Sequence, residues 1–154
     1  MTTADDKTIV KEYFNATGFD RWRRIYGEGE VNKVQKDIRF GHQQTIDTVI
    51  NWLKEEGGLQ GQSICDAGCG VGSLSIPLAE MGGTIYSSDI SEKMVEEAKS
   101  RAKQILGNHH NIKFTVADLE ALTGSYDSVI CLDVLIHYPQ EQAREMITHL
   151  ASLA

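Results

Sequence analysis

The stretch Ser63-Ile-Cys-Asp-Ala-Gly-Cys-Gly-Val-Gly72 decides the fold of this 154-residue chain. It predicts a short strand at 63–66, followed by a turn with glycine at every second position. A helical pattern then runs from Ser73 to Met81. Glycine lets a backbone turn sharply, and a ligand can approach the main chain because no Cβ stands in the way. A strand, a glycine turn and a helix in this order indicate a ligand site at the carboxyl end of a parallel strand.

Strands and helices alternate after the glycine turn. We expect further strands at 84–87, 112–116 and 126–132, a helix at 92–106 capped by Ser91, and a last helix after Pro139. The nearly all-apolar run at 129–132 predicts that the last of these strands is buried on both faces. The alternation predicts an α/β fold with a doubly wound, mainly parallel sheet.

The residues before the glycine turn have a helical pattern instead. We expect a short helix at 5–15, a turn at 19–26, and a long helix from about Val31 to the glycines at 57–58. The apolar stripes of the predicted helices include Val34, Ile105 and Ile147. This change of pattern divides the chain into an N-terminal helical arm at 1–60 and an α/β core at 61–154.

The charge of the chain is acidic and uneven. Fifteen Lys and Arg against twenty-two Asp and Glu give a net charge of −7, which argues against a nucleic-acid partner. Residues 1–60 carry 9 basic and 10 acidic residues, whereas residues 61–154 carry 6 and 12. The N-terminal part is therefore the better candidate for contact with an anionic partner.

The cysteines and the chain start bear on the compartment. Three cysteines without a Cys-x-x-Cys pair are typical of free thiols in a reducing compartment and indicate no metal site. The start is polar and acidic, without the pattern of a signal or transit peptide, and no apolar run is long enough to span a bilayer. We therefore expect a cytoplasmic protein.

Acidic residues follow the first three predicted strands. Asp66 precedes the glycine turn, Asp89 follows the second strand and Asp118 follows the third. A carboxylate at the second strand can accept both hydroxyls of a ribose, and one near the turn favours an ammonium group over a pyrophosphate. Ser73 also replaces the last glycine of the dinucleotide fingerprint Gly-x-Gly-x-x-Gly. Together these features predict a pocket for a nucleoside that carries a positive charge.

This constellation resembles the class I S-adenosylmethionine-dependent methyltransferases over residues 60–138. Its four motifs are the glycine turn, Ser87-Ser-Asp-Ile-Ser91, Ala117-Asp-Leu119 and Tyr126-Asp-Ser-Val-Ile-Cys-Leu-Asp133. The resemblance implies that S-adenosylmethionine is bound by residues of all four motifs: Asp66, Gly68 and Gly70 at the methionine part, Asp89 and Ile90 at the ribose, Asp118 and Leu119 at the adenine, and Leu132 at the amino-acid end.

The resemblance also implies more strands than this chain supplies. The sheet of the class I methyltransferases has seven strands, and the sequence predicts four. We therefore expect the C-terminal strands of the fold to be absent from this chain, and we expect the chain by itself to be poorly stable, because the last strand has an open edge.

A closer resemblance lies outside these motifs. The stretches Gly18-Phe-Asp-Arg-Trp-Arg-Arg-Ile-Tyr-Gly27, Ile38-Arg-Phe-Gly-His42 and Cys131-Leu-Asp-Val-Leu-Ile-His-Tyr-Pro139 are similar to the magnesium protoporphyrin IX O-methyltransferase family of chlorophyll biosynthesis. This similarity implies esterification of one porphyrin propionate to the monomethyl ester, with S-adenosylhomocysteine as the second product and magnesium only as part of the substrate. It also raises two partners as expectations: a magnesium chelatase subunit that hands over the porphyrin, and a membrane surface.

Several residues suit that substrate. Arg21 and Arg24 flank Trp22, so cations for propionates stand beside an aromatic surface for a flat macrocycle, although a solvated helix face with such arginines is also common. His137 follows the fourth strand and is a candidate to orient the carboxylate or accept a proton. Tyr26 is a candidate donor to the same carboxylate, with His137 as the second catalytic residue. His42, on the inner stripe of the long helix, is expected to be a buried structural residue.

Two other functions stay open at this point. One is a methyltransferase for another small molecule, such as a quinone or an amine. The other is a non-catalytic module with the same fold that binds a partner, which the three intact carboxylates disfavour. A nucleotide-dependent oxidoreductase is disfavoured by Ser73.

Overall fold

The computed structural model of the chain describes residues 3–154. Helices precede the first strand, and strands then alternate with helices and two short 3-10 turns. The elements in chain order are α1 (Thr3–Phe14), α2 (Thr17–Ile25), α3 (Lys33–Glu55), β1 (Ser63–Ala67), α4 (Ser75–Glu80), β2 (Thr84–Asp89), α5 (Glu92–Leu106), β3 (Ile112–Val116), η1 (Leu119–Ala121), β4 (Ser128–Ile130), η2 (Leu135–His137) and α6 (Gln140–Ser152).

The four strands form one parallel sheet in the order β3-β2-β1-β4. Cys65 of β1 lies opposite Tyr86 of β2 on one side and Val129 of β4 on the other. The chain therefore leaves β1 in one direction for β2 and β3, and returns on the other side of β1 as β4. This reversal places a switch point beside β1, where parallel sheets hold their ligands. The predicted α/β class with a parallel sheet is confirmed.

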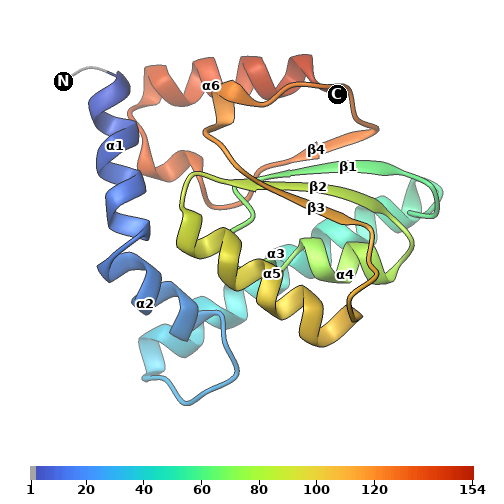
Figure 1. Cartoon of the computed structure of the whole chain (residues 1–154), viewed down its shortest axis with the longest axis horizontal. Helices are drawn as coiled ribbons and strands as arrows, with labels where there is room; N and C mark the ends of the chain where they lie inside the picture. Colours follow the sequence, from blue (N-terminus) through green and yellow to red (C-terminus); the bar gives the residue numbers. More distant parts are fainter. Residues whose placement is uncertain (1–2) are drawn as a thin grey trace.

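Helices cover both faces of the sheet (Figure 1). Helices α3, α4 and α5 lie below it in that view, and α6 lies above it. Successive residues of β1 point to opposite faces of the sheet and pack in two different apolar clusters. Ile64 packs in one cluster with Ile46 and Leu78, and Cys65 packs in the other with Met146 and Leu150. Full burial of an Ile or Leu side chain contributes about 1.5–3 kcal/mol. Both faces of β1 are thus stabilised by apolar packing.

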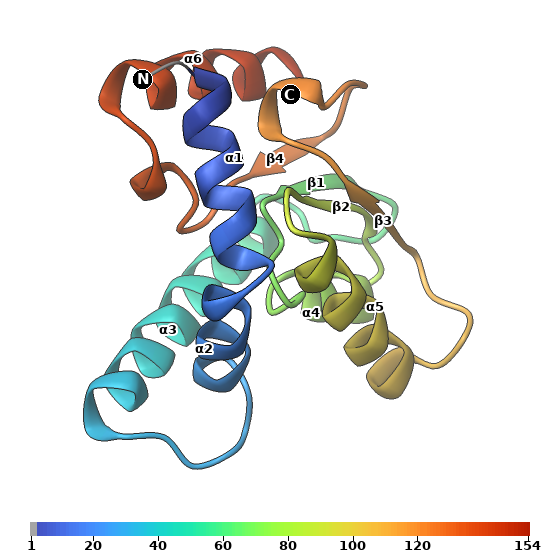
Figure 2. The ribbon, with the colours of Figure 1, turned by 60° about the vertical axis from the view of Figure 1, so that its left-hand side comes forward.

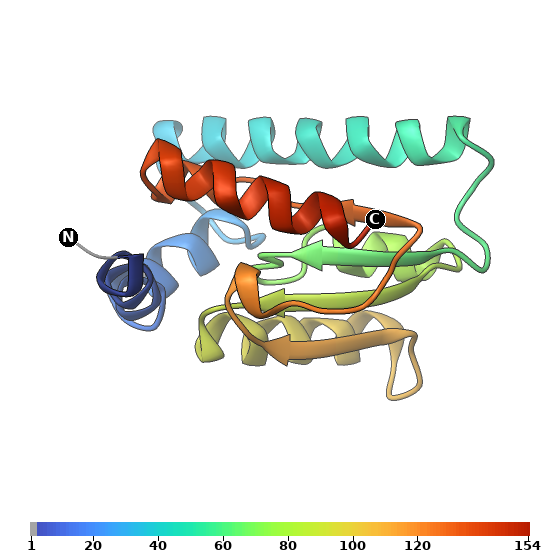
Figure 3. The same cartoon turned by 90° about the horizontal axis from the view of Figure 1, so that it is seen from above.

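Helices α1 and α2 lie across the carboxyl end of the sheet. In Figure 3 the arrowheads of β1, β2 and β3 point toward α1, and Figure 2 shows α1 crossing in front of the strand ends. Asn32 begins α3 with a capping box, in which it exchanges hydrogen bonds with Gln35. The N-terminal helices therefore face the edge at which the ends of the strands and the glycine turn meet.

Two arginines hold the C-terminal end of α2. Arg39 of α3 donates through Nε to the Ile25 carbonyl at 2.6 Å and through Nη2 to the Arg24 carbonyl at 2.9 Å. Arg101 of α5 donates through Nη1 to the Tyr26 carbonyl at 3.1 Å. The last carbonyls of a helix have no partners within it and carry partial negative charge, so guanidinium groups satisfy them well. These bonds fix α2 to the core from two sides.

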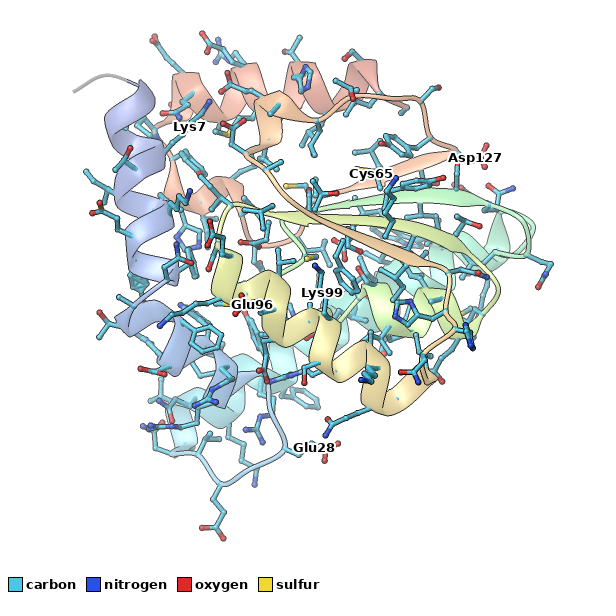
Figure 4. All side chains as sticks on the ribbon, viewed as in Figure 1. Lys7, Glu28, Cys65, Glu96, Lys99 and Asp127 are labelled. Atoms are coloured by element: carbon cyan, nitrogen blue, oxygen red, sulfur yellow. The ribbon has the colours of Figure 1, made fainter. Side chains whose placement is uncertain are left out.

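A second set of contacts fixes α1. The Ser91 hydroxyl lies 2.6 Å from Asn15 Oδ1 and donates to the Phe14 carbonyl at 3.1 Å, while it also caps α5 through Met94 N. Lys7 Nζ lies 3.7 Å from Asp118 Oδ2 and 3.4 Å from Glu120 Oε1. Figure 4 shows Lys7 on α1, on the side toward the segment after β3. The predicted cap at Ser91 is confirmed, and it also joins the helical arm to the core.

Helix α4 and strand β4 are shorter than the sequence predicts. Helix α4 spans Ser75–Glu80 rather than residues 73–81. Strand β4 spans only Ser128–Ile130, and residues 129–132 are half-buried rather than buried on both faces. Among residues 3–154 only β1 pairs with β4, so this strand is an edge of the sheet.

Some residues of the predicted apolar stripes are exposed. Val34 is 67% exposed, Ile105 60% and Ile147 53%, because each lies at the margin of its helix face, while Ile46, Ala102 and Met146 are buried. Within the described part of the chain, no helix has both the length and the apolar character needed to cross a bilayer.

Replacing Arg39 tests how the arm is held. We expect Arg39→Ala to lower the free energy of unfolding by about 1–3 kcal/mol, because it leaves carbonyls at the end of α2 without their donor. Lys36→Ala, at an exposed position of the same helix, serves as the control. Urea unfolding measures both variants, and equal effects would contradict the assigned role of Arg39.

Candidate functional site

A cavity of about 360 Å³ lies between the carboxyl ends of the strands and helices α1, α2 and α3. This volume is within the range of small-molecule sites. Most of the site residues predicted from the sequence line it, and they come from both the arm and the core: Trp22, Tyr26, Gly68, Gly70, Asp89, Ile90, Asp118, Leu119, Leu132 and His137.

The glycine turn forms one wall of the cavity. Gly68 has φ +83°, and a Cβ at this position would collide with Val134. Its amide donates to the Ser88 carbonyl at 2.8 Å, and the Cys69 amide donates to the same carbonyl at 2.7 Å. Only glycine fits both the left-handed backbone and the close approach of the segment after β4. The turn is thereby held against the end of β2.

Asp89 is fixed where β2 ends. Its Oδ2 accepts from the Gly70 amide at 2.9 Å, and its Oδ1 accepts from the Ser91 amide at 2.9 Å. Burial raises the pKa of the Asp89 carboxyl, and main-chain hydrogen bonds from Ser91, Gly70 and Ile90 oppose that shift. A carboxylate oxygen has two lone pairs. With three main-chain donors on its four lone pairs, the Asp89 carboxylate keeps one acceptor position for a ligand hydroxyl.

Asp118 is fixed in a similar way after β3. Its Oδ1 caps η1 by accepting from the Ala121 amide at 2.9 Å, and its Oδ2 faces Lys7 at 3.7 Å. Leu119, the next residue, is 6% exposed and lines the cavity. The structure thus places an acidic group and an apolar side chain next to each other at this end of the cavity, which suits an aromatic base.

Asp66 lies outside the residues that line the cavity. It is 2% exposed, and its Oδ2 accepts from the Ser75 hydroxyl at 2.6 Å. Burial raises the pKa of Asp66 to about 6, the Ser75 hydrogen bond lowers it, and the charge of Asp89 raises it. The direct contact with a ligand ammonium that the sequence predicts has no place in this geometry, because β1 buries the carboxylate behind the glycine turn.

Tyr26, His42 and His137 gather on the opposite wall. The Tyr26 ring stacks on the His42 ring, with centroids 4.0 Å apart and planes inclined by 19°. Burial, and secondarily the charge of Asp133, raises the pKa of Tyr26 to about 12, so the phenol keeps its proton at neutral pH. Burial lowers the pKa of His137, against the charge and main chain of Asp133, so the imidazole is neutral there. The wall therefore offers one phenol donor and one neutral imidazole.

The predicted arginines lie outside the cavity lining. Arg21 and Arg24 are exposed, and the Arg21 guanidinium lies 5.4 Å from the centroid of the Trp22 ring. Trp22 itself lines the cavity, and its buried Nε1 has no hydrogen-bond partner among the described residues. Because a buried N–H without a partner is unfavourable, Trp22 is a donor available to a bound acceptor.

Two lining residues differ from what the sequence predicted. His42 was expected to be structural, yet it lines the cavity and its Nδ1 lies 3.1 Å from Asp133 Oδ2. Asp133 was absent from the predicted site, and it also lines the cavity. The two residues are 91 positions apart, so no local pattern joins them.

Comparisons with known proteins cover both the arm and the core. A family model described as "Methyltransferase domain" matches residues 64–154. Magnesium-protoporphyrin O-methyltransferase from Synechocystis sp. is 65% identical over 156 residues, which cover 100% of this chain and 68% of that protein. The chain belongs to the magnesium-protoporphyrin O-methyltransferase family.

More distant and structural comparisons agree with membership of this family. Magnesium protoporphyrin IX methyltransferase, chloroplastic, from Arabidopsis thaliana is 59% identical over 150 residues, covering 97% of this chain and 48% of that protein. The crystal structure of magnesium protoporphyrin IX methyltransferase from Synechocystis PCC 6803 with bound SAM has a TM-score of 0.95 at 64% identity, covering 100% of this chain and 74% of that chain. This chain therefore spans about half to three quarters of the family members it matches.

The buried Asp66 gives a pH-dependent prediction. Folding raises the pKa of the Asp66 carboxyl from 3.8 to about 6, so the folded chain favours the protonated carboxyl. Its contribution to the free energy of unfolding is therefore complete at low pH, and it is lost as the pH rises to about 6. We expect Asp66→Asn, which cannot ionise and can still accept from Ser75, to be more stable than the native chain by about 3 kcal/mol above pH 6.

The gain in the free energy of unfolding from Asp66→Asn should shrink as the pH falls toward 4. Urea unfolding at pH 7.5 and pH 4.5 measures this gain. Glu145→Gln, at an exposed position of α6, is the control. A gain that is the same at both pH values would show that the ionisation of Asp66 does not limit the stability of the fold.

Proposed function

We propose that this chain is the methyl-transferring part of an S-adenosylmethionine-dependent O-methyltransferase that esterifies one propionate of magnesium protoporphyrin IX. The products are the monomethyl ester and S-adenosylhomocysteine, a step of chlorophyll biosynthesis. One observation carries this proposal: the 65% identity extends over the arm, which supplies Trp22, Tyr26 and His42 to the cavity, and not only over the methyltransferase domain at 64–154. A methyltransferase for a quinone or an amine would need only the core in common.

The core residues fit S-adenosylmethionine. Gly68 and Gly70 would lie along the methionine part, Asp89 and Ile90 at the ribose, Asp118 and Leu119 at the adenine, and the Leu132 main chain at the amino-acid end. The acceptor position that remains on Asp89 supports the ribose assignment. When bound, S-adenosylmethionine supplies an electrophilic methyl group on a sulfonium. We assign Asp66 an indirect part, in which its charge acts on that cation from behind the glycine turn.

The arm side fits a carboxylate nucleophile. A propionate is ionised near neutral pH, so the reaction needs no strong base. The chain's contribution is then alignment of the carboxylate and exclusion of water. Tyr26 donates to one carboxylate oxygen, and His137 orients the group from η2. Phe14 packs against His137, with ring centroids 5.1 Å apart, and covers this end of the cavity.

The macrocycle is assigned to the mouth of the cavity beside α2. Trp22 offers both a flat surface and the unpartnered Nε1, and Arg21 and Arg24 stand outside at positions suited to the propionate that is not methylated. The exposed Phe40 and Ile136, at 65% and 79%, extend the apolar surface beyond the cavity. We assign to this exposed surface the docking of a magnesium chelatase subunit and peripheral contact with a membrane. We place the protein in the cytoplasm.

The division of the chain into a helical arm at 1–60 and an α/β core at 61–154 stays a prediction.

A binding and transfer experiment tests the function. We expect the full chain to bind S-adenosylmethionine and magnesium protoporphyrin IX in calorimetric titrations, and to produce the monomethyl ester and S-adenosylhomocysteine in equal amounts. Binding of the cofactor with transfer to a quinone or an amine, but not to the porphyrin, would replace this function by the second candidate. If the chain does not bind S-adenosylmethionine, only the third candidate function, a non-catalytic module that binds a partner, would remain.

Variants of Tyr26 and His137 test the arm side of the site. We expect Tyr26→Phe and His137→Ala each to lower kcat by roughly 10²-fold, because each removes a group that orients or stabilises the reacting carboxylate. The dissociation constant of S-adenosylmethionine should stay within about twofold, since neither residue is assigned to the cofactor. Tyr13→Phe is the matched control for the phenol. Unchanged turnover in both variants would remove them from the mechanism.

A further inference from the structure

Asp133 has an unusual backbone. Its φ is +58°, and it is the only residue other than glycine with a positive φ among residues 3–154. A left-handed conformation costs an L-residue on the order of 1–2 kcal/mol, and glycine would adopt it without that cost. Strain of this kind persists where the surroundings fix it, and it concentrates at functional sites. The side chain of Asp133 therefore needs an explanation.

The Asp133 carboxylate does not serve the local backbone. The N-cap of η2 is Val134, and it has no side-chain capping bond. The Asp133 side chain instead faces His42 of α3, with Oδ2 at 3.1 Å from Nδ1. The Asp133 carboxylate thus joins the segment after β4 to helix α3 of the arm.

The contact with His42 fixes the protonation of that ring. A carboxylate oxygen accepts but does not donate, so the proton on the ring must sit at Nδ1. His42 Nε2 is then the nitrogen left without this partner. The His42 side chain is 15% exposed and the Asp133 side chain 50% exposed, so the pair lies partly out of water. The bond also sets the plane of the imidazole.

The plane of the His42 imidazole matters because the Tyr26 ring stacks on it. The two rings stack at 4.0 Å with an inclination of 19°, and no hydrogen bond to the Tyr26 hydroxyl is formed within the described residues. The Trp22 ring also packs on Tyr26, with centroids 5.4 Å apart, so the His42 ring is one of two rings that set the direction of the phenol. Asp133, His42 and Tyr26 form a connected series from the segment after β4, through α3, to the C-cap of α2.

Charge gives this series a second role. An acidic side chain in a cavity that accepts a carboxylate would repel the substrate. The His42 Nδ1–H engages the Asp133 oxygen, which reduces that repulsion. The pairing therefore explains how an acidic residue is compatible with the proposed substrate.

We propose that Asp133 is a positioning residue for methyl transfer: it fixes the tautomer and plane of His42 beneath Tyr26, the group assigned to donate to the substrate carboxylate. This inference rests on the proposed function. Asp133 and His42 act through Tyr26, and neither is assigned a contact with the reacting atoms.

Glycine and asparagine at position 133 separate positioning from folding. Both tolerate the left-handed backbone, so Asp133→Gly keeps the turn and removes the carboxylate, while Asp133→Asn keeps an acceptor without the charge. We expect Asp133→Gly to lower kcat for porphyrin methylation by tenfold or more, and Asp133→Asn to restore part of it. The dissociation constant of S-adenosylmethionine should stay within about twofold in each variant. Glu145→Gln is the control.

A double-mutant cycle tests the pairing itself. His42→Phe keeps a ring to stack on Tyr26 but removes Nδ1–H. If the two residues act as one unit, the double variant Asp133→Gly/His42→Phe should have the same kcat as the less active of the two single variants. Multiplication of the two single effects would overturn the proposal, as would full activity of Asp133→Gly.

Nitrogen-15 NMR of the histidine rings gives a readout without turnover. We expect His42 to carry its proton at Nδ1 in the native chain and to lose this preference in Asp133→Gly. A native His42 protonated only at Nε2 would overturn the pairing. If the native chain transfers no methyl group to the porphyrin, the proposed function fails, and the ring spectra still confirm or reject the Asp133–His42 bond.

Discussion

The hydrogen bond from the Gly70 amide to the Asp89 carboxylate is the constraint on which the rest of the site depends. It joins the glycine turn after β1 to the end of β2, and the Ser91 amide holds the other oxygen of the same carboxylate. Ser91 then caps α5 and also contacts Asn15. A single carboxylate therefore orders the turn, the start of α5 and, through Ser91, the arm. The strand order places this group at the switch point, so the fold leads directly to the position of the cavity.

Helices α1 and α2 are held by polar contacts, whereas α3 packs Ile46 into the apolar core beneath the sheet. The fixed points of α1 and α2 are carbonyls at the end of α2 bonded by Arg39 and Arg101, the Asn15–Ser91 contact, and the Lys7 ion pairs. Bonds of this type exchange with water more readily than buried apolar contacts do. In the proposed function, helices attached in this way can exclude water during the reaction and still release a large, flat product.

The sequence predicts the core of the site better than its arm side. The strands, their parallel pairing and the placement of Asp89 and Asp118 at the strand ends follow from alternation and from the geometry of parallel sheets, which are local or topological properties. The burial of Asp66 could not be predicted, because it depends on how β1 turns relative to Ser75. The sequence assigns Arg21 and Arg24 to the porphyrin propionates because they flank Trp22, and the structure leaves both exposed and outside the cavity lining. Their place could not be predicted, because it depends on how α2 packs on α3, where Arg39 bonds the last α2 carbonyls.

The Asp133–His42 contact could not be predicted for a different reason. It joins residues far apart in the chain through a left-handed backbone, and neither property has a local signal at an aspartate. Asp66 and Asp133 have a common feature nonetheless. One is a carboxyl buried so that its pKa rises to about 6, and the other is a carboxylate held in a strained conformation. Each lowers stability where a neutral residue or a glycine would raise it. In the proposed function, a chain that keeps both residues uses part of its stability to fix charge around a cation and a carboxylate, which is the electrostatic requirement of methyl transfer between them.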